Sequence, residues 1–208
     1  MGKIGSKLLF DSVELLSTLP GIGKKSALRM ALHLANLEPS KTLKLADSLT
    51  KLANELKTCS HCFLYSDTDI CDICANPARD PKTICIVESI KDLIAIEETN
   101  QYHARYHILG GLISPIDGIG PENLNLNTLV ERISNDGVQE LIMAIRPSIE
   151  GDTTIYYISK LCTDKNIKIS MIARGVSFGS ELEFTDEITL GRSILSRTPY
   201  LIHDNLMV

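Results

Sequence analysis

The sequence predicts an α/β protein in which a helical N-terminal module and a small four-cysteine ribbon precede a mostly parallel sheet flanked by helices. Three observations lead to this prediction. Residues 7–57 carry apolar side chains at helical spacing. Residues 58–80 contain four of the six cysteines and show little periodicity. From about residue 82, short apolar runs alternate with helical segments, as is typical of βαβ units.

The N-terminal module is expected to contain three helices. The breaker sequence Leu-Pro-Gly-Ile-Gly at 19–23 separates the first two. The third is expected to start near Ser40, a good N-cap residue after Pro39. One face of this third helix would carry Leu45, Leu49, Leu52 and Leu56.

The sheet part is expected to alternate strands and helices. The apolar runs predict strands at 84–87, 107–109, 141–145 and 167–172. The helical segments lie near 90–99, 124–135, 153–165 and 189–197.

Composition limits the function classes. The chain has 208 residues and a net charge of −5, so contact with DNA would need a local basic patch or a favourable geometry. No apolar run approaches the roughly 18 residues that span a bilayer, and residues 1–5 lack the apolar core of a signal peptide. We expect a soluble, cytoplasmic protein, in which cysteines are more often metal ligands or buried thiols than disulfides.

Four cysteines form two C-x-x-C knuckles separated by eight residues. Each knuckle places two thiolates on a tight turn, so four sulfurs can converge tetrahedrally on Zn²⁺, with no position left for water. The alternatives are redox motifs or disulfides, and His61 inside the first knuckle could also serve as a ligand. Cys85 and Cys162 fall in a predicted strand and helix and are expected to be buried thiols. The expected zinc ligands are Cys59, Cys62, Cys71 and Cys74.

The glycine-lysine stretch at residues 21–26 could bind phosphate in one of two ways. A nucleotide-binding P-loop requires G-x-x-x-x-G-K-[ST] after a strand, and here both the spacing and the helical flank differ. A helix-hairpin-helix fits better. Gly21 and Gly23 permit a tight turn with exposed N–H groups, and the positive end of a helix starting at about Lys24 lies beside it.

The helix after this turn carries a basic face. Lys25 and Arg29 are four residues apart, and His33 extends the same face. A DNA strand lying along it would be held through its phosphates, independently of base sequence. The alternative is an αα-hairpin whose basic face is merely solvated.

Three acidic residues follow predicted strands. Glu88 directly follows the run 84–87, while Glu150 and Asp152 follow the run 141–145 after a short loop. The carboxyl ends of strands line the functional crevice of an open α/β sheet, so these carboxylates could together hold Mg²⁺. Alternatively, Glu150 and Asp152 simply favour the N-terminus of the following helix.

The order of these parts resembles the RecR family of bacterial recombination mediators, from about Leu8 to Pro199. The motifs that carry the resemblance are the hairpin L-P-G-I-G-x-K-S-A-x-R, the four-cysteine knuckle, the strand I-C-I-V-E-S, the turn D-G-I-G-P and the loop E-G-D. The resemblance implies a helix-hairpin-helix module at 1–57, a four-cysteine zinc finger at 58–80, a Toprim domain at 81–175 and an oligomerising segment at 176–208.

The resemblance also implies a function and its partners. Members of this family form dimers or ring-like tetramers that encircle DNA, single- or double-stranded and independently of sequence. They act with RecO, and in many bacteria with RecF, to load RecA onto single-stranded DNA coated by single-strand-binding protein. One structural Zn²⁺ per chain is implied, and any Mg²⁺ would not be catalytic.

Site residues can be carried over by motif. The DNA-binding residues would be Gly21, Gly23, Lys25 and Arg29. The zinc ligands would be the four knuckle cysteines. The Toprim acids Glu88, Glu150 and Asp152 would form an acidic face that binds RecO, and no residue would be catalytic.

Two departures from the family pattern stand out. Arg146 precedes Pro147 where the family usually has asparagine, and its charge could pair with the acids and weaken a metal site. The family's P-V-G-G turn is replaced by Ser-Phe-Gly-Ser at 177–180, which puts the conformation of that loop in doubt.

Three functions are compatible with these patterns. A non-enzymatic DNA clamp and mediator is favoured, because a closed ring holds DNA topologically and tolerates a net charge of −5. A Toprim phosphodiesterase using Mg²⁺ is the second, although the chain has no visible second catalytic module and its tyrosines lie in no nucleophile motif. The third is a zinc-stabilised scaffold that does not contact DNA.

Overall fold

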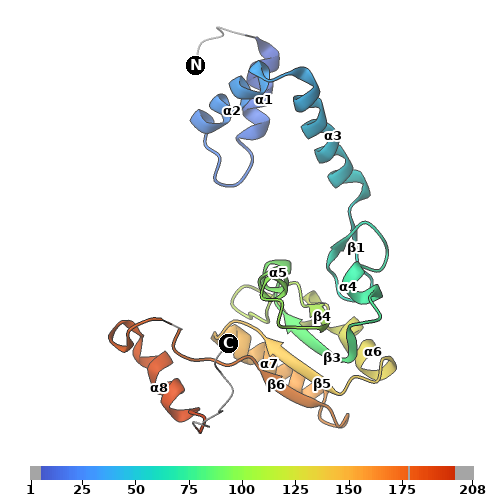
Figure 1. Ribbon diagram of the computed structural model, residues 1–208, viewed down its shortest axis with the longest axis vertical. Helices are drawn as coiled ribbons and strands as arrows, with labels where there is room; N and C mark the ends of the chain where they lie inside the picture. Colours follow the sequence, from blue (N-terminus) through green and yellow to red (C-terminus); the bar gives the residue numbers. More distant parts are fainter. Residues whose placement is uncertain (1–5, 178, 200–208) are drawn as a thin grey trace, which may run out of the picture. The chain divides into compact units, whose positions relative to one another are not determined.

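The computed structural model describes residues 6–177 and 179–199 (Figure 1). The chain divides into two compact units, one ending at Leu56 and one beginning at Lys57. The first unit is helical, which confirms the helical N-terminal module. Its helices are α1 (Lys7–Leu16), α2 (Lys24–Asn36) and α3 (Pro39–Glu55).

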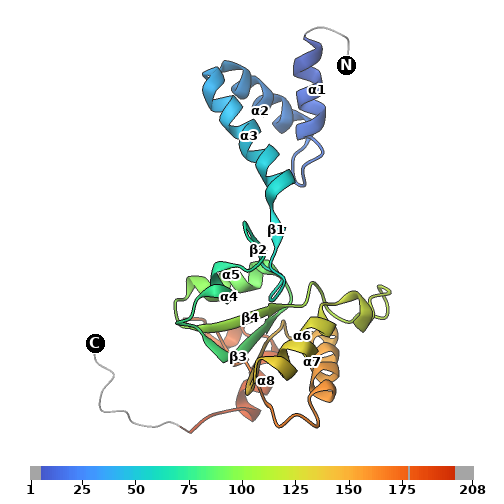
Figure 2. The same cartoon turned by 90° about the vertical axis from the view of Figure 1, so that its right-hand side faces the viewer.

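A glycine turn joins α1 to α2 (Figure 2). Gly21 has a φ of +79°, in the left-handed region that other residues adopt only with strain. Gly23 is the N-cap residue of α2, which begins at Lys24 as the sequence predicts. α2 packs on α1 and buries Ala27 and Ala31, so two small side chains allow the helices to approach closely.

The third helix starts earlier than expected, and the prediction that Ser40 is its N-cap is wrong. Pro39 occupies its first turn and Glu38 is the N-cap, while the Ser40 hydroxyl donates to a Glu38 carboxylate oxygen at 2.8 Å. Proline suits this position because the N–H of the first helical residue would have no hydrogen-bond partner within the helix. The predicted leucine face of α3 is exposed in the single chain; its members are Leu45, Leu49, Leu52 and Leu56.

A small ribbon opens the second unit. Strand β1 (Lys57–Thr58) pairs antiparallel with β2 (Tyr65–Ser66). The one-turn helix α4 (Asp72–Ala75) follows. This region therefore has little regular structure of its own, as its lack of periodicity predicted.

A four-stranded parallel sheet forms the centre of the second unit. Its strands lie in the order β4-β3-β5-β6, which confirms the expected parallel α/β architecture. The strands are β3 (Asp80–Val87), β4 (Ala104–Ile108), β5 (Glu140–Ala144) and β6 (Lys168–Met171). Val87, the last residue of β3, aligns with Ile108 and Ala144, so the carboxyl ends of three strands meet at one edge.

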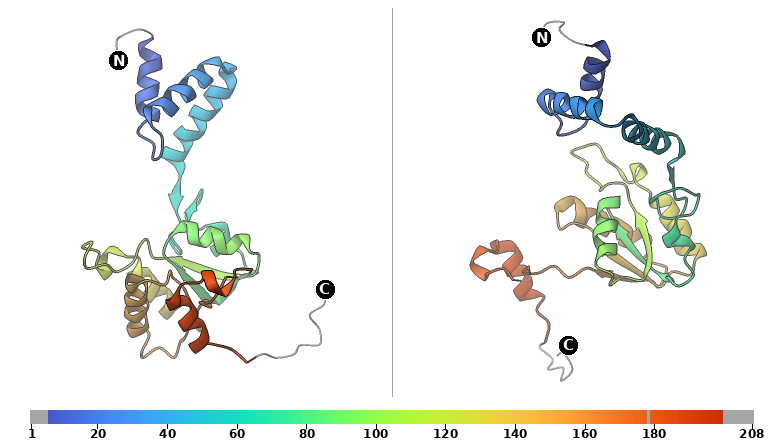
Figure 3. Two further views of the ribbon diagram at one scale, coloured as in Figure 1. Left: turned by 90° about the vertical axis from the view of Figure 1, so that its left-hand side faces the viewer. Right: turned by 45° about the horizontal axis from the view of Figure 1, so that its top comes forward.

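Helices cover both faces of this sheet (Figures 2 and 3). Helix α5 packs on one face, and α6 and α7 pack on the other. The helical segments are α5 (Ile90–Glu98), η1 (Pro121–Asn123), α6 (Leu126–Asn135), α7 (Ile149–Leu161), η2 (Leu182–Phe184) and α8 (Glu187–Leu195). Across the described residues, none of the helices combines the length and apolar character needed to cross a membrane.

Two of these helices begin earlier than the sequence predicted. α7 starts at Ile149 rather than near 153, because the Ser148 hydroxyl caps it by accepting from the N–H of Gly151 at 3.1 Å. α8 starts at Glu187 rather than near 189, because the Asp186 carboxylate caps it in the same way. The C-terminal run from residue 200 lies outside the described residues.

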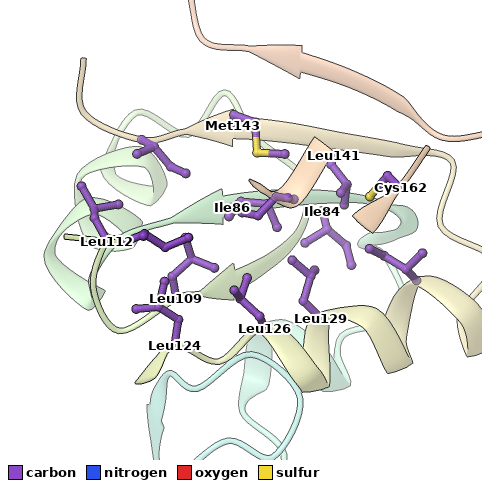
Figure 4. Packing of buried hydrophobic residues seen from close by; sticks show 14 of the residues in the cluster. Ile84, Ile86, Leu109, Leu112, Leu124, Leu126, Leu129, Leu141, Met143 and Cys162 are labelled. Carbon is purple, nitrogen blue, oxygen red and sulfur yellow. The ribbon is translucent and has the colours of Figure 1, made fainter. Parts of the chain in front are cut away.

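Strand β3 contributes side chains to two hydrophobic clusters. Ile84 and Ile86 point into the cluster beneath α6 and α7 (Figure 4), whereas Cys85 and Val87 point toward α5. This alternation is the two-residue period of a strand buried on both faces. Burying each large aliphatic side chain contributes about 1.5–3 kcal/mol. Cys85 and Cys162 are both buried, as expected, and burial raises the pKa of Cys85 to about 12.

Candidate zinc centre and nucleic-acid interface

The four knuckle cysteines converge in the second unit. Their sulfur atoms all lie within 4.8 Å of one another, and the sulfurs of Cys62 and Cys71 are 3.5 Å apart. Four sulfurs around tetrahedral zinc, with bonds of about 2.3 Å, would be about 3.8 Å apart. All four side chains are buried. The cluster therefore fits a structural zinc in both donor set and size.

Local turns bring each pair of cysteines together. In the first knuckle the N–H of Phe63 donates to the carbonyl of Cys59 at 3.0 Å, and Phe63 itself has a φ of +66°. In the second knuckle Cys71 is the N-cap of α4 and Cys74 lies within that helix. His61 is not a member of the cluster, so the geometry favours the four-cysteine set over the alternative with histidine.

The close packing of the thiols perturbs their pKa values. Burial raises the pKa of Cys71 to about 11, whereas the hydrogen bond with Cys62 lowers the pKa of Cys74 to about 6. The positive charge of Arg132 lowers the Cys74 pKa further. The cluster thus holds dissociable protons at close quarters, and a divalent cation binding there would displace them.

The ribbon is attached to the sheet beneath it. The N–H of Ile108, in β4, donates to the carbonyl of Cys62 at 3.0 Å. The Phe63 ring packs edge-on against His107, with 5.5 Å between ring centroids. An Arg132 Nη1 contact to the carbonyl of His61 at 3.1 Å ties the first knuckle to α6. These contacts therefore fix the first knuckle of the ribbon to strand β4 and helix α6.

The start of α2 has the features of a phosphate site. No side chain caps this end of the helix, and Gly23 leaves open space around its Cα. The first N–H groups of a helix lack intrahelical partners and carry the positive end of the dipole. Lys25, Arg29 and His33 are all exposed, as their spacing on one helix face predicts. The arrangement can hold an anion through backbone and side-chain donors together.

The three predicted acids lie near the carboxyl edge of the sheet, but two of them are paired with arginines. Glu88 accepts from Arg146 at 3.2 Å, and Asp152 accepts from Arg174 at 2.9 Å. Glu150 lies in the first turn of α7, where hydrogen bonding with Ser148 lowers its pKa. Within the described ranges, the cysteine cluster is the one group of three or more candidate metal ligands whose ligand atoms all lie within 4.8 Å.

Four family models match the chain. They are the RecR helix-hairpin-helix at 12–53, the RecR four-cysteine zinc finger domain at 56–76, the Toprim domain at 82–173 and the RecR C-terminal region at 175–198. The Recombination protein RecR of Amoebophilus asiaticus is 53% identical over 195 residues, which covers 94% of this chain and 98% of that protein. The chain belongs to the RecR family.

Two further relatives carry the same printed name. The RecR of Flavobacterium johnsoniae is 50% identical over 198 residues, covering 95% of this chain and 96% of its own length. The RecR of Porphyromonas gingivalis strain W83 is 46% identical with the same coverage. The likeness therefore extends over all four matched regions rather than resting on one motif.

Family membership clarifies the departures noted in the sequence. The pairing of Arg146 with Glu88 that the RecR comparison suggested is present. The E-G-D loop is the first turn of α7, and its glycine is required sterically, because a Cβ at Gly151 would collide with the backbone carbonyl of Arg146. In the altered turn, Gly179 has a φ of +80° and the N–H of Ser180 donates to Ser177 at 3.2 Å, while Phe178 lies outside the described residues.

Two buried polar residues beside the RecR zinc finger were not found from the sequence. His107 lies in β4 and its Nε2 is 2.7 Å from the carbonyl of Asn125, and burial lowers its pKa to about 4. Arg132 lies in α6 among apolar positions. An arginine in an amphipathic helix is normally solvent-exposed, so no sequence signal marked it.

Proposed function

We propose that this chain is a non-enzymatic DNA-binding mediator of recombinational repair that holds DNA inside a ring of RecR-type subunits. The observation that carries the proposal is the uncapped N-terminus of α2, with Gly23 open and Lys25 and Arg29 exposed beside it. It occurs in a chain that matches RecR proteins over 94% of its length.

The hairpin would grip the DNA backbone without selecting a sequence. Backbone N–H groups at the start of α2 bind one phosphate, and the Lys25 and Arg29 side chains bind phosphates further along the same face. Successive turns of the helix separate these two side chains by a rise of about 6 Å. Each neutralised phosphate adds roughly −0.9 to the slope of log affinity against log salt on duplex DNA. The slope therefore grows with the number of subunits whose hairpins contact the DNA.

The ring accounts for binding by a chain whose net charge is −5. Topological enclosure removes the need for a strongly basic surface, so the outside of the ring can stay acidic. The same proposal places the protein in the cytoplasm, as a dimer or a ring-like tetramer. The oligomerising segment would begin at about residue 176, after modules ending at about 57, 80 and 175.

Zinc has a structural part in this proposal. One Zn²⁺ per chain, held by the four knuckle cysteines, would fold the ribbon at the start of the second unit. Mg²⁺ is given no catalytic role. The arginine pairs of Glu88 and Asp152 support this, because a guanidinium beside each carboxylate disfavours the binding of a second cation there.

The acidic edge of the sheet is proposed as the partner surface. Glu88, Glu150 and Asp152 would bind RecO, and RecF where it is present, so that RecA is loaded onto single-stranded DNA coated by single-strand-binding protein. Their place at the carboxyl edge, two paired with an arginine and one at a helix start, suits recognition by a partner surface more than chemistry.

The hairpin assignment is tested by charge reversal. Lys25→Glu with Arg29→Glu should sharply weaken binding of both single- and double-stranded oligonucleotides, while circular dichroism and zinc content stay unchanged. The matched control reverses Lys41 and Lys44, two exposed lysines of α3, and should bind nearly as the wild type does. If the two double variants bound DNA equally well, the hairpin would not be the DNA-binding element. Mg²⁺-dependent plasmid nicking that Glu88→Ala abolishes would overturn the non-enzymatic assignment.

A further inference from the structure

A buried arginine lies beside the zinc-binding ribbon. The Arg132 side chain, in α6, is 5% exposed. Its Nη1 donates to the carbonyl of Tyr106 at 2.7 Å and lies 3.1 Å from the carbonyl of His61 and 3.3 Å from Nδ1 of His107. Its Nε and Nη2 have no hydrogen-bond partner in the part of the chain that the structure describes.

Protein groups alone leave this charge poorly compensated. The nearest carboxylate is that of Asp136, 3.7 Å from Nε, which is too long for a hydrogen bond and partly open to solvent. His107 is held neutral by burial, so its Nδ1 can accept a hydrogen bond from Arg132 but offers no negative charge. A buried cation with unsatisfied N–H groups is strongly destabilising unless a negative group lies close by.

Arg132 contacts the segment that carries two of the four clustered cysteines. His61, which accepts from Arg132, lies between Cys59 and Cys62 in the first knuckle. Four thiolates around one Zn²⁺ carry a net charge of about −2. Thiolate sulfurs bound to a metal remain hydrogen-bond acceptors for groups outside the coordination shell.

We propose that Arg132 is the countercharge of the zinc-tetrathiolate centre and a positioning residue for its first knuckle. This inference rests on the cluster holding zinc, as proposed above. Arg132 offsets part of the net negative charge of the loaded cluster from the sheet side. Its Nη1 contacts both the carbonyl of His61 in the first knuckle and the carbonyl of Tyr106 in β4, so it links the knuckle to the sheet.

The coupling between zinc and Arg132 is reciprocal. If Arg132 strengthens zinc binding, zinc must favour the buried position of Arg132 by the same factor. Loss of zinc would leave a cation buried between α6 and β4 without compensation. The zinc centre would therefore stabilise the edge of the sheet domain as well as the ribbon that contains it.

The test measures zinc affinity of the full chain by competition with a chromogenic chelator. Arg132→Met should weaken zinc binding by about 10–100-fold, and Arg132→Lys, which keeps a charge, should lose less. The matched control is Arg105→Met in β4: Arg105 also has a buried Nε without a partner in the described chain, but its charge acts on Asp80. This control should bind zinc as the wild type does.

A second readout separates charge compensation from packing. Arg132→Met should lower the denaturant midpoint more when zinc is bound than after chelation. An equal drop in both states, or wild-type zinc affinity in Arg132→Met, overturns the proposal. Where the variants fail to fold, hydrogen exchange on the wild-type chain decides: chelation should increase exchange in α6, and unchanged exchange there overturns the proposal. A wild-type chain that binds no zinc at all would instead refute the zinc centre itself.

Discussion

Removal of zinc from the wild-type chain should unfold the ribbon and leave the central sheet folded. Three partly buried hydrophobic residues of the ribbon, Phe63, Leu64 and Ile73, pack against the cysteines or the adjoining core. Their burial contributes about 4.5–9 kcal/mol at most. Structural zinc contributes about 10–16 kcal/mol in small zinc-finger peptides. Metal binding, not hydrophobic burial, therefore holds residues 57–76 in place.

The central strands have an independent source of stability. β3 and β5 lie in a cluster of fifteen buried residues that does not include the knuckle cysteines. The loss of zinc should therefore stay local to the ribbon and to its contacts with β4 and α6.

Hydrogen exchange with mass spectrometry, with and without a strong chelator, measures this directly. Amides of residues 57–76 should lose nearly all protection after chelation, and those of β3 and β5 should keep theirs. Cys74→Ser should reproduce the chelated pattern without chelator, whereas Cys85→Ser should not, because Cys85 lies outside the cluster. Persistent protection of the ribbon after complete zinc removal would refute the reasoning, since the protein contacts alone would then suffice.

Four further substitutions have defined outcomes. Gly23→Ala should leave the thermal midpoint almost unchanged, because nothing lies within 4 Å of the added methyl group, but it should weaken DNA binding by crowding the phosphate. Gly21→Ala should destabilise the hairpin, because alanine is strained at the φ of +79° that Gly21 adopts. If Gly23→Ala were instead the more destabilising of the two, the turn geometry would be contradicted. Gly151→Ala should cost several kcal/mol of unfolding free energy, because the methyl group would overlap the carbonyl of Arg146; a denaturant melt that matches the wild type would refute this. The pKa of Glu97 is lowered, because hydrogen bonds from Arg79 and Tyr106 outweigh the effect of burial. Its stabilising contribution is therefore present above the unfolded-state value of about 4.3 and is lost as pH falls through the lower folded value. Glu97→Gln should destabilise the chain by about 2 kcal/mol at pH 7, and its stability should fall less steeply than that of the wild type as pH drops below the unfolded-state value. Parallel pH–stability curves for the two proteins would contradict this.

Local patterns predicted much of the fold and the zinc centre. The glycine turn and the start of α2 at Lys24 follow from residues within one or two turns of each other. The four cysteines are likewise specified by short spacings, so their convergence was predictable before any tertiary contact was known. The pairing of Arg146 with Glu88 could also be anticipated, because both residues follow neighbouring strands of a parallel sheet.

Features that depend on distant contacts were not predictable from the sequence. The start of α7 was predicted too late, because the cap formed by Ser148 directly follows a proline, a residue that is typical of loops. The burial of Arg132 and His107 depends on how α6, β4 and the ribbon meet, and these lie far apart in sequence. The leucine face of α3 was recognisable as a face, but a single chain does not show what would cover it.

In the proposed function, a ring of these subunits encloses DNA, with the hairpin of each subunit facing the strand. The most direct test compares retention of the wild-type protein on closed circular DNA and on the same DNA linearised, at a salt concentration that suppresses simple electrostatic binding. A ring that encloses DNA should stay long on the circle and be lost rapidly from the free ends of the linear form. Equal dissociation rates from the two forms would contradict it.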